Sequence, residues 1–115
     1  MSFWRRQVIQ PALDHETRKH MEEQLAWIAR EPANPRPYHY LAEFYRMEGQ
    51  HDQALGLQLQ AVHLDPAFAP AHAALSEIYA VRGDYQAAWR HARQAEQGGE
   101  LRAVEMLRRH GVAEL

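Results

Sequence analysis

The sequence repeats itself with a period of 34 residues. When residues 34–66 are compared with the residues 34 positions later, seven identical pairs fall in one register, where ordinary composition would give roughly two. The pairs are Leu41 and Leu75, Glu43 and Glu77, Tyr45 and Tyr79, Gly49 and Gly83, Ala54 and Ala88, Gln60 and Gln94, and Ala61 and Ala95. A fixed period of this length is typical of repeat architectures, in which each unit buries its apolar face against its neighbours. The period therefore predicts stacked helical units that present an extended surface.

Within each unit, the spacing of small and apolar residues fits two helices joined by a turn. Ala54 and Ala61 are seven residues apart, so they share one helical face that a neighbouring helix can approach closely. Leu41 and Tyr45 form an apolar stripe on the preceding helix. Gly49 follows that stripe, where a chain leaving a helix often needs a positive φ. We expect the alanines to be buried between helices and the tyrosine to be a core residue, and the same for their partners one period later.

The repeated unit resembles the tetratricopeptide repeat, a helix–turn–helix of 34 residues. In the first unit the matching residues are Tyr38, Leu41, Ala42, Tyr45, Gly49, Ala54, Ala61, Leu64 and Pro66. In the second unit they are Leu75, Tyr79, Gly83, Tyr85, Ala88 and Ala95. The sequence departs from the family pattern at Gln58, His72, Ala92, Gly98 and Glu100. The resemblance covers about residues 34–100 and implies an all-α fold, a right-handed superhelical stack of antiparallel helix pairs.

The chain is expected to form a single domain of six or seven helices with no strand. Residues 1–33 are a divergent N-terminal arm and capping helix, 34–66 the first repeat, 67–100 the second, and 101–115 a C-terminal capping helix. Pro11 either interrupts the chain between the arm and the capping helix or lies in the first turn of that helix. The apolar stripe of the capping helix is Leu13, Met21, Leu25 and Ile28. Trp27 takes the place of Ala61, so this helix should stand further from its neighbour.

Composition excludes several classes of function. A net charge of −2 gives no basic stripe for nucleic acid, and no apolar run is long enough to span a membrane. The chain has no cysteine, so disulfides and thiol chemistry are excluded. The first residues lack the apolar segment of a signal peptide, so we expect a cytoplasmic location.

Eight histidines raise the question of a metal site. His15 and His20 are five residues apart and diverge around a helix, unlike the i,i+4 pair of a zinc helix motif. His39 and His72 lie near equivalent places in the two units, which leaves open an approach of the two across the stack. No arrangement of nucleophile, acid and base stands out, so we expect no metal, no cofactor and no catalytic activity.

The resemblance implies a concave groove lined by the first helix of each unit. The residues at the matching positions are Arg36, His39, Tyr40, Glu43, Arg46 and Met47, then Ala73, Glu77, Ala80 and Val81. Glutamates stand where a clamp for a peptide carboxylate would need asparagine, which argues against that mode of binding. Alanines leave room for a bound chain, and Glu43 and Glu77 favour a partner that carries Arg or Lys.

The expected function is therefore a non-catalytic protein–protein interaction module that binds a peptide or helix in this groove. An alternative is a structural unit that assembles with copies of itself. Association would then use the stack ends or the aromatic residues Phe3, Trp4 and Trp27. A third outcome is that the terminal helices fill the groove themselves. The sequence leaves open the partner, the pathway and the oligomeric state.

Overall fold

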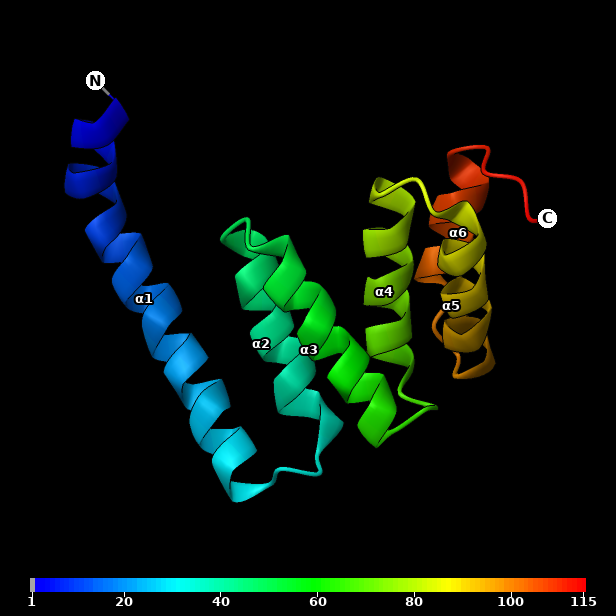
Figure 1. Ribbon diagram of the computed structural model, residues 1–115, viewed down its shortest axis with the longest axis horizontal. Helices are drawn as coiled ribbons and strands as arrows, with labels where there is room; N and C mark the ends of the chain where they lie inside the picture. Colours follow the sequence, from blue (N-terminus) through cyan, green and yellow to red (C-terminus); the bar gives the residue numbers. More distant parts are fainter. Residues whose placement is uncertain (1) are drawn as a thin grey trace.

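The computed structural model describes the backbone of residues 2–115 and the side chains of residues 15–115. This part of the chain contains no strand and six helices: α1 (Ser2–Arg30), α2 (Pro35–Met47), α3 (His51–Leu64), α4 (Ala69–Val81), α5 (Tyr85–Gln97) and α6 (Arg102–Arg109). Figure 1 shows α2 with α3 and α4 with α5 as two antiparallel pairs, α6 beside α5, and α1 leaning away from α2. The predicted all-α class is confirmed. The hand of the superhelix and the division into units stay predictions.

The turn inside each helix pair is set by a glycine at the same place in the repeat. Gly49 after α2 has a φ of 79° and Gly83 after α4 has a φ of 82°. Their N–H groups donate to the carbonyls of Arg46 and Ala80, each at 3.0 Å. Side chains with a Cβ rarely adopt this backbone conformation, whereas glycine does so without strain. The glycine turns predicted from the sequence are therefore confirmed.

Short polar side chains begin two of the helices. Asn34 Oδ1 accepts from the N–H of Arg36 at 3.0 Å at the start of α2, and Pro35 occupies the first helical turn. Asp84 Oδ1 accepts from the N–H of Ala87 at 3.1 Å at the start of α5. These bonds satisfy N–H groups that have no partner inside the helix. The short connections between helices are thus specified locally.

Alanines form the contacts between neighbouring helices. Ala54, Ala61, Ala88 and Ala95 are at most 1% exposed, so their predicted burial is confirmed. The helix α4 lies in the centre of the stack and packs against α3, α5 and α6. On the side of α4 that faces α5 and α6, the core consists of Ala73, Ala88, Trp89, Ala92, Ala95, Ala103, Val104 and Leu107. Small side chains on α4 and α5 leave the room that Trp89 and Leu107 fill.

Tyr45 and Tyr79 are half-buried, so their assignment as enclosed core residues is only partly right. The ring of Tyr79 packs at the edge of the core and stacks on His91, with 5.5 Å between the ring centroids. The stack is only 19 Å deep in its shortest dimension, about two helix diameters. A large side chain in so thin a layer rarely escapes the solvent completely.

The N-terminal helix differs from the sequence prediction. The helix α1 continues from Ser2 through Pro11 to Arg30, so the predicted arm and capping helix are one helix. Proline supplies no N–H and removes one helical hydrogen bond, which weakens a helix without always ending it. The side chains of Phe3, Trp4 and Leu13, on which the predicted aromatic arm and part of the apolar stripe depend, lie outside the described residues.

The buried face of α1 is also rotated from the predicted stripe. Leu25 is 51% exposed, so its assignment to the stripe is wrong. The half-buried side chains are instead Thr17, Met21, Gln24, Trp27 and Ile28. The indole of Trp27 stacks on Tyr40 of α2 at 6.2 Å between centroids. This stacked indole accompanies the divergence of α1 from α2 in Figure 1.

Two glycines without positive φ are expected to respond oppositely to alanine substitution. Gly98 faces Ala69, and a Cβ at Gly98 would lie 2.7 Å from the Ala69 Cβ. Gly98→Ala should therefore lower the free energy of unfolding by about 1 kcal/mol through overpacking. Gly56 lies in the exposed interior of α3 with no atom within 4 Å of an added Cβ. Gly56→Ala should raise the same quantity by about 0.5–1 kcal/mol. Urea denaturation of both variants tests the pair, and a shift of the same sign in both would contradict the described contact between the end of α5 and the start of α4.

Candidate functional site

Four of the ten predicted groove residues come together around the C-terminal half of α4. A hollow of about 280 Å³ lies between α2 and α4, here called the α2–α4 hollow. Its lining residues are Arg46, His51, Glu77, Ile78, Val81 and Arg82. A hollow of about 400 Å³, here called the α4–α6 hollow, lies on the other side of α4. Its lining residues are Glu77, Ala80, Val81, Tyr85, Met106, Leu107, His110 and Val112.

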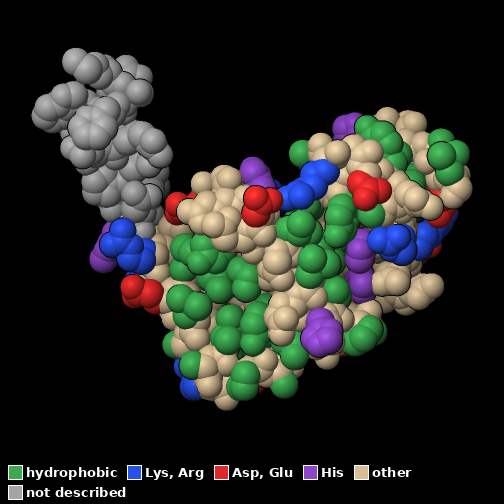
Figure 2. Space-filling view, in the orientation of Figure 1, with side chains coloured by type: hydrophobic (Ala, Val, Ile, Leu, Met, Phe, Trp, Pro, Cys, Tyr) green, Lys and Arg blue, Asp and Glu red, His purple; other side chains and the backbone are tan. Residues whose placement is uncertain are grey.

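Glu77 and Val81 line both hollows, so the two form adjoining parts of one surface. The Val81 side chain is 90% exposed and stands between them. Ile78 is only 8% exposed and forms part of the floor of the α2–α4 hollow. Figure 2 shows charged side chains of both signs near the upper edge where the two helix pairs meet, with apolar side chains below. The surface therefore combines an apolar interior with a charged rim.

Six of the predicted groove residues line neither hollow. Arg36, His39, Tyr40, Glu43 and Met47 lie on α2 away from both, although Met47 is 69% exposed. Ala73 is 0% exposed, so its prediction as a groove residue is wrong. The helix α6 packs against α4, and Ala73 belongs to the core that α6 closes with Ala103, Val104 and Leu107. The terminal helix thus covers the part of the predicted groove where Ala73 lies.

Glu43 is the centre of a hydrogen-bond network between α2 and α3. Its carboxylate accepts from Arg46 Nη2 at 2.9 Å and from Gln58 Nε2 at 3.4 Å. The amide oxygen of Gln58 in turn lies 2.9 Å from Nδ1 of His39, which must carry the hydrogen of this bond. Gln58 is 1% exposed, so these contacts satisfy a buried amide where the family pattern has an aromatic residue. The network fixes the direction of the Glu43 and Arg46 side chains.

The two glutamates predicted to face a basic partner already have arginine partners within the chain. Glu43 pairs with Arg46, and Glu77 lies 3.6 Å from Arg102. The hydrogen bond from Arg46 to Glu43 and the charge of Glu43 raise the pKa of Arg46, and the charge of Glu77 adds to the shift. Arg46 lies one turn after Glu43 on α2, whereas the packing of α6 against α4 brings Arg102 beside Glu77.

A further ion pair joins α3 to the end of α4 at the α2–α4 hollow. Arg82 Nη2 lies 2.7 Å from Asp52 Oδ1, and Arg82 also lines the hollow. Asp52 is highly exposed, so solvent screens this pair and its contribution to stability is small. Its effect is to hold the Arg82 side chain near the rim of the hollow.

His72 and His91 form a hydrogen-bonded pair between α4 and α5, whereas His39 bonds to Gln58. Nε2 of His72 lies 2.7 Å from the carbonyl of Pro66 and must donate to it. Its Nδ1 is then the acceptor for Nδ1–H of His91, at 3.0 Å. One period earlier, the hydroxyl of Tyr38 donates to the carbonyl of Pro32 at 2.8 Å. His72 therefore replaces a tyrosine with the same hydrogen bond.

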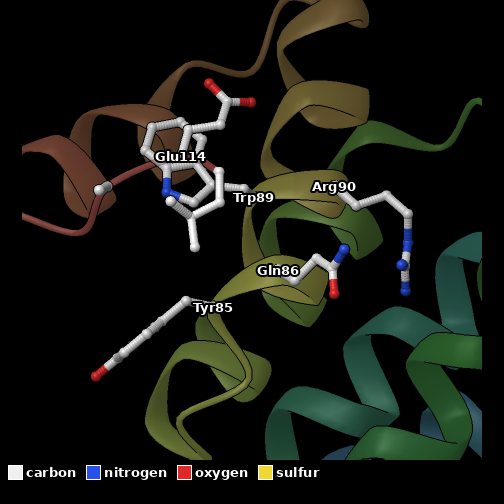
Figure 3. A pocket seen from close by; sticks show the side chains of 7 residues that line it. Tyr85, Gln86, Trp89, Arg90 and Glu114 are labelled. Atoms are coloured by element: carbon white, nitrogen blue, oxygen red, sulfur yellow. The ribbon is translucent and has the colours of Figure 1, made fainter.

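A third hollow, which the sequence did not predict, lies on the outer face of α5 and is here called the α5 hollow. Its volume is about 430 Å³, and its lining residues are Tyr85, Gln86, Trp89, Arg90, Ala113, Glu114 and Leu115. Figure 3 shows Tyr85 and Arg90 projecting from α5 to opposite sides of the view. The segment after α6 forms one wall because it folds back onto α5. In the sequence, the one indication of the α5 hollow is an aromatic residue and a basic residue one helical turn apart, Trp89 and Arg93.

A metal site or a membrane span would each need a particular set of residues in the described part of the chain. Among residues 15–115, no three His, Asp or Glu side chains are close enough together to hold a metal ion. Across the helices that the structure describes, none combines the length and apolar character needed to cross a bilayer.

Comparison with known families supports the helical repeat. Residues 24–56 match the tetratricopeptide repeat. The predicted resemblance is confirmed for this segment, which runs from the last turns of α1 through α2 into α3. The matched tetratricopeptide segment begins at residue 24, whereas the sequence period placed the start of the first repeat at residue 34. The comparison with curated proteins gives no match. A tetratricopeptide repeat indicates a protein–protein interaction module and belongs to a generally non-catalytic class.

Proposed function

We propose that the chain is a non-catalytic interaction module that binds a peptide or helical segment of another protein across the α2–α4 and α4–α6 hollows. The observation that carries this proposal is that the two hollows share Glu77 and Val81. A segment laid across α4 contacts both hollows at once, with Val81 in the centre. This placement resembles the way in which an amphipathic helix or an extended chain lies in a groove.

Apolar contacts supply most of the expected affinity. Val81 is almost fully exposed in the free chain, and Ile78 and Met106 lie in the two hollows beside it. Burial of such surface is favourable by about 25 cal/mol per Å² before the costs of association. A methionine adapts its shape to different side chains, which suits a surface that accepts more than one sequence.

Charge plays a smaller part than the sequence suggests. Basic side chains on a partner in the hollows would compete with Arg102 for Glu77, which lines both hollows. Exchanging one ion pair for another changes the free energy of binding little. We therefore expect a basic partner to gain orientation from Glu77 and affinity from the apolar contact with Val81.

Substitution of Val81 tests this proposal. Val81→Gln should leave the free energy of unfolding within about 0.5 kcal/mol, because the side chain is exposed and glutamine suits a helix. Peptides selected on the immobilised parent from a random displayed library are the ligands, and calorimetric titration gives their affinities. We expect Val81→Gln to weaken them by roughly 10-fold, about 1.4 kcal/mol.

Leu25→Gln on α1 is the matched control, because Leu25 is also an exposed apolar side chain on a helix. It should leave these affinities unchanged. Equal affinities of the parent and Val81→Gln would contradict the proposed site. Self-assembly is the alternative function, and light scattering that shows a stable oligomer dispersed by Val81→Gln would favour it.

A further inference from the structure

The segment after α6 binds to α5 through a backbone carbonyl and a carboxylate. The indole Nε1–H of Trp89 donates to the carbonyl of Val112 at 3.1 Å. The guanidinium of Arg93 holds Glu114 with two nitrogens: Nε lies 2.9 Å from Oε2, and Nη2 contacts Oε1. The N–H of Val112 also donates to the carbonyl of Leu107 at 2.9 Å. The segment thus lies on α5 as a short peptide ligand would.

The geometry of these two contacts fits any extended chain. Trp89 and Arg93 are four residues apart on a helix, so their side chains are separated by about 6 Å along its axis. The acceptors belong to Val112 and Glu114, two residues apart in a non-helical segment. An extended chain advances by about 3.3 Å per residue, so two residues span nearly the same distance. A carbonyl followed two residues later by a carboxylate is therefore the pattern that this face recognises.

The charges around the contact favour an acidic ligand. Arg93 lies over the Trp89 ring, 5.1 Å from its centroid, and also pairs with Glu96 at 3.0 Å. The hydrogen bond from Arg93 lowers the pKa of Glu114, and the charges of Arg93 and Arg108 lower it further. Arg90 lines the hollow from the same helix. Bidentate arginine contacts of this kind match the geometry of a carboxylate.

The segment fills the face only in part. A hollow of about 430 Å³ remains beside it, lined on α5 by Tyr85, Gln86, Trp89 and Arg90. Tyr85 is 50% exposed, and Leu115 is fully exposed. Room and aromatic surface are thus left for side chains larger than the alanine and leucine that flank Glu114.

We propose that the α5 face formed by Tyr85, Trp89, Arg90 and Arg93 is a second binding surface, which takes an extended acidic segment of another protein in competition with residues 112–115 of this chain. It lies on α5, apart from the α2–α4 hollow, and it shares Tyr85 with the α4–α6 hollow. Residues 112–115 act as a tethered competitor, so a ligand binds more tightly once their carboxylate is removed. A tethered segment has an effective concentration on the order of mM, which a free peptide must exceed.

The test uses the full chain and the Trp89 indole N–H resonance, assigned by its loss in Trp89→Phe. The ligands are acetyl-Val-Ala-Glu-Leu-amide and its twin with Gln in place of Glu. In Glu114→Gln, the Glu peptide should shift the resonance saturably, with an apparent dissociation constant at least about tenfold lower than in the parent. The Gln peptide should bind at least about tenfold more weakly than the Glu peptide.

Glu96→Gln is the matched control, because it removes the other carboxylate on Arg93 and leaves Glu114 in place. It should bind the Glu peptide as weakly as the parent. If the resonance of Glu114→Gln stays where it is in the parent, Glu114→Arg replaces it, since like charges then separate the segment from Arg93. Three results would each overturn the proposal. They are release of the segment without saturable peptide binding, equal affinities for the two peptides, and dimer formation in place of peptide binding.

Discussion

Replacing Trp89 by alanine is expected to lower the free energy of unfolding by about 3–5 kcal/mol, as for other large core aromatics. The indole is 5% exposed and packs in the core where α4, α5 and α6 meet. Its removal leaves a cavity between Ala73 and Leu107 and breaks the hydrogen bond to Val112. A domain of this size has about 5–15 kcal/mol of stability, so the loss is a large share of the whole. Urea denaturation followed by circular dichroism measures it.

Trp89→Phe separates packing from hydrogen bonding. Phenylalanine keeps the six-membered ring but lacks the pyrrole ring with its N–H, so it should cost about 1–3 kcal/mol, less than alanine. A loss for Trp89→Ala no larger than that for Trp89→Phe would mean that α6 does not close the core as described.

The protein is expected to lose stability as the pH falls from about 6.5 towards 4. Burial lowers the pKa of His91 to about 4, and the charges of His72 and Arg90 add to the shift. In the unfolded chain a histidine has a pKa near 6.5. Between about pH 4 and pH 6.5 the unfolded state binds more protons than the folded state. The contribution of neutral His91 to the free energy of unfolding is therefore fully present above about pH 6.5 and is lost as the pH falls. Since His91 is only half-buried, solvent reduces the effect to about 2 kcal/mol.

His91→Gln measures this contribution directly. A glutamine amide can donate to His72 Nδ1 at any pH, so the variant should lose less stability than the parent between pH 6.5 and 4. His63→Gln, at an exposed position of α3, should follow the parent. Unfolding curves at a series of pH values give the comparison, and coincident profiles for the parent and His91→Gln would assign the acid response to other groups.

Much of the fold followed from local spacing in the sequence. The 34-residue period places Gly49 and Gly83 at equivalent turns, and both adopt the positive φ that such a turn needs. The same period places Ala54 and Ala88 on equivalent helix faces, and both are buried. Helical periodicity and turn chemistry act over a few residues, so they are readable without knowledge of the packing.

The candidate site was predicted less completely. Arg46, Glu77, Ala80 and Val81 line the hollows, whereas Ala73 lies in the core. A helical position predicts which face of its own helix a side chain occupies. It does not predict whether a terminal helix will cover that face, as α6 covers Ala73.

By itself, the sequence determined that this chain forms stacked helical hairpins, where their turns lie and which small residues separate the helices. Only the tertiary structure decided that His72 pairs with His91, 19 residues away, and that Arg93 holds Glu114, 21 residues away. The physical reason is that helix formation and turns depend on neighbours in the chain, whereas these side-chain partners depend on the angles and distances at which helices pack. Those angles arise from the sum of many small contacts, and a single repeat pattern permits more than one arrangement of them.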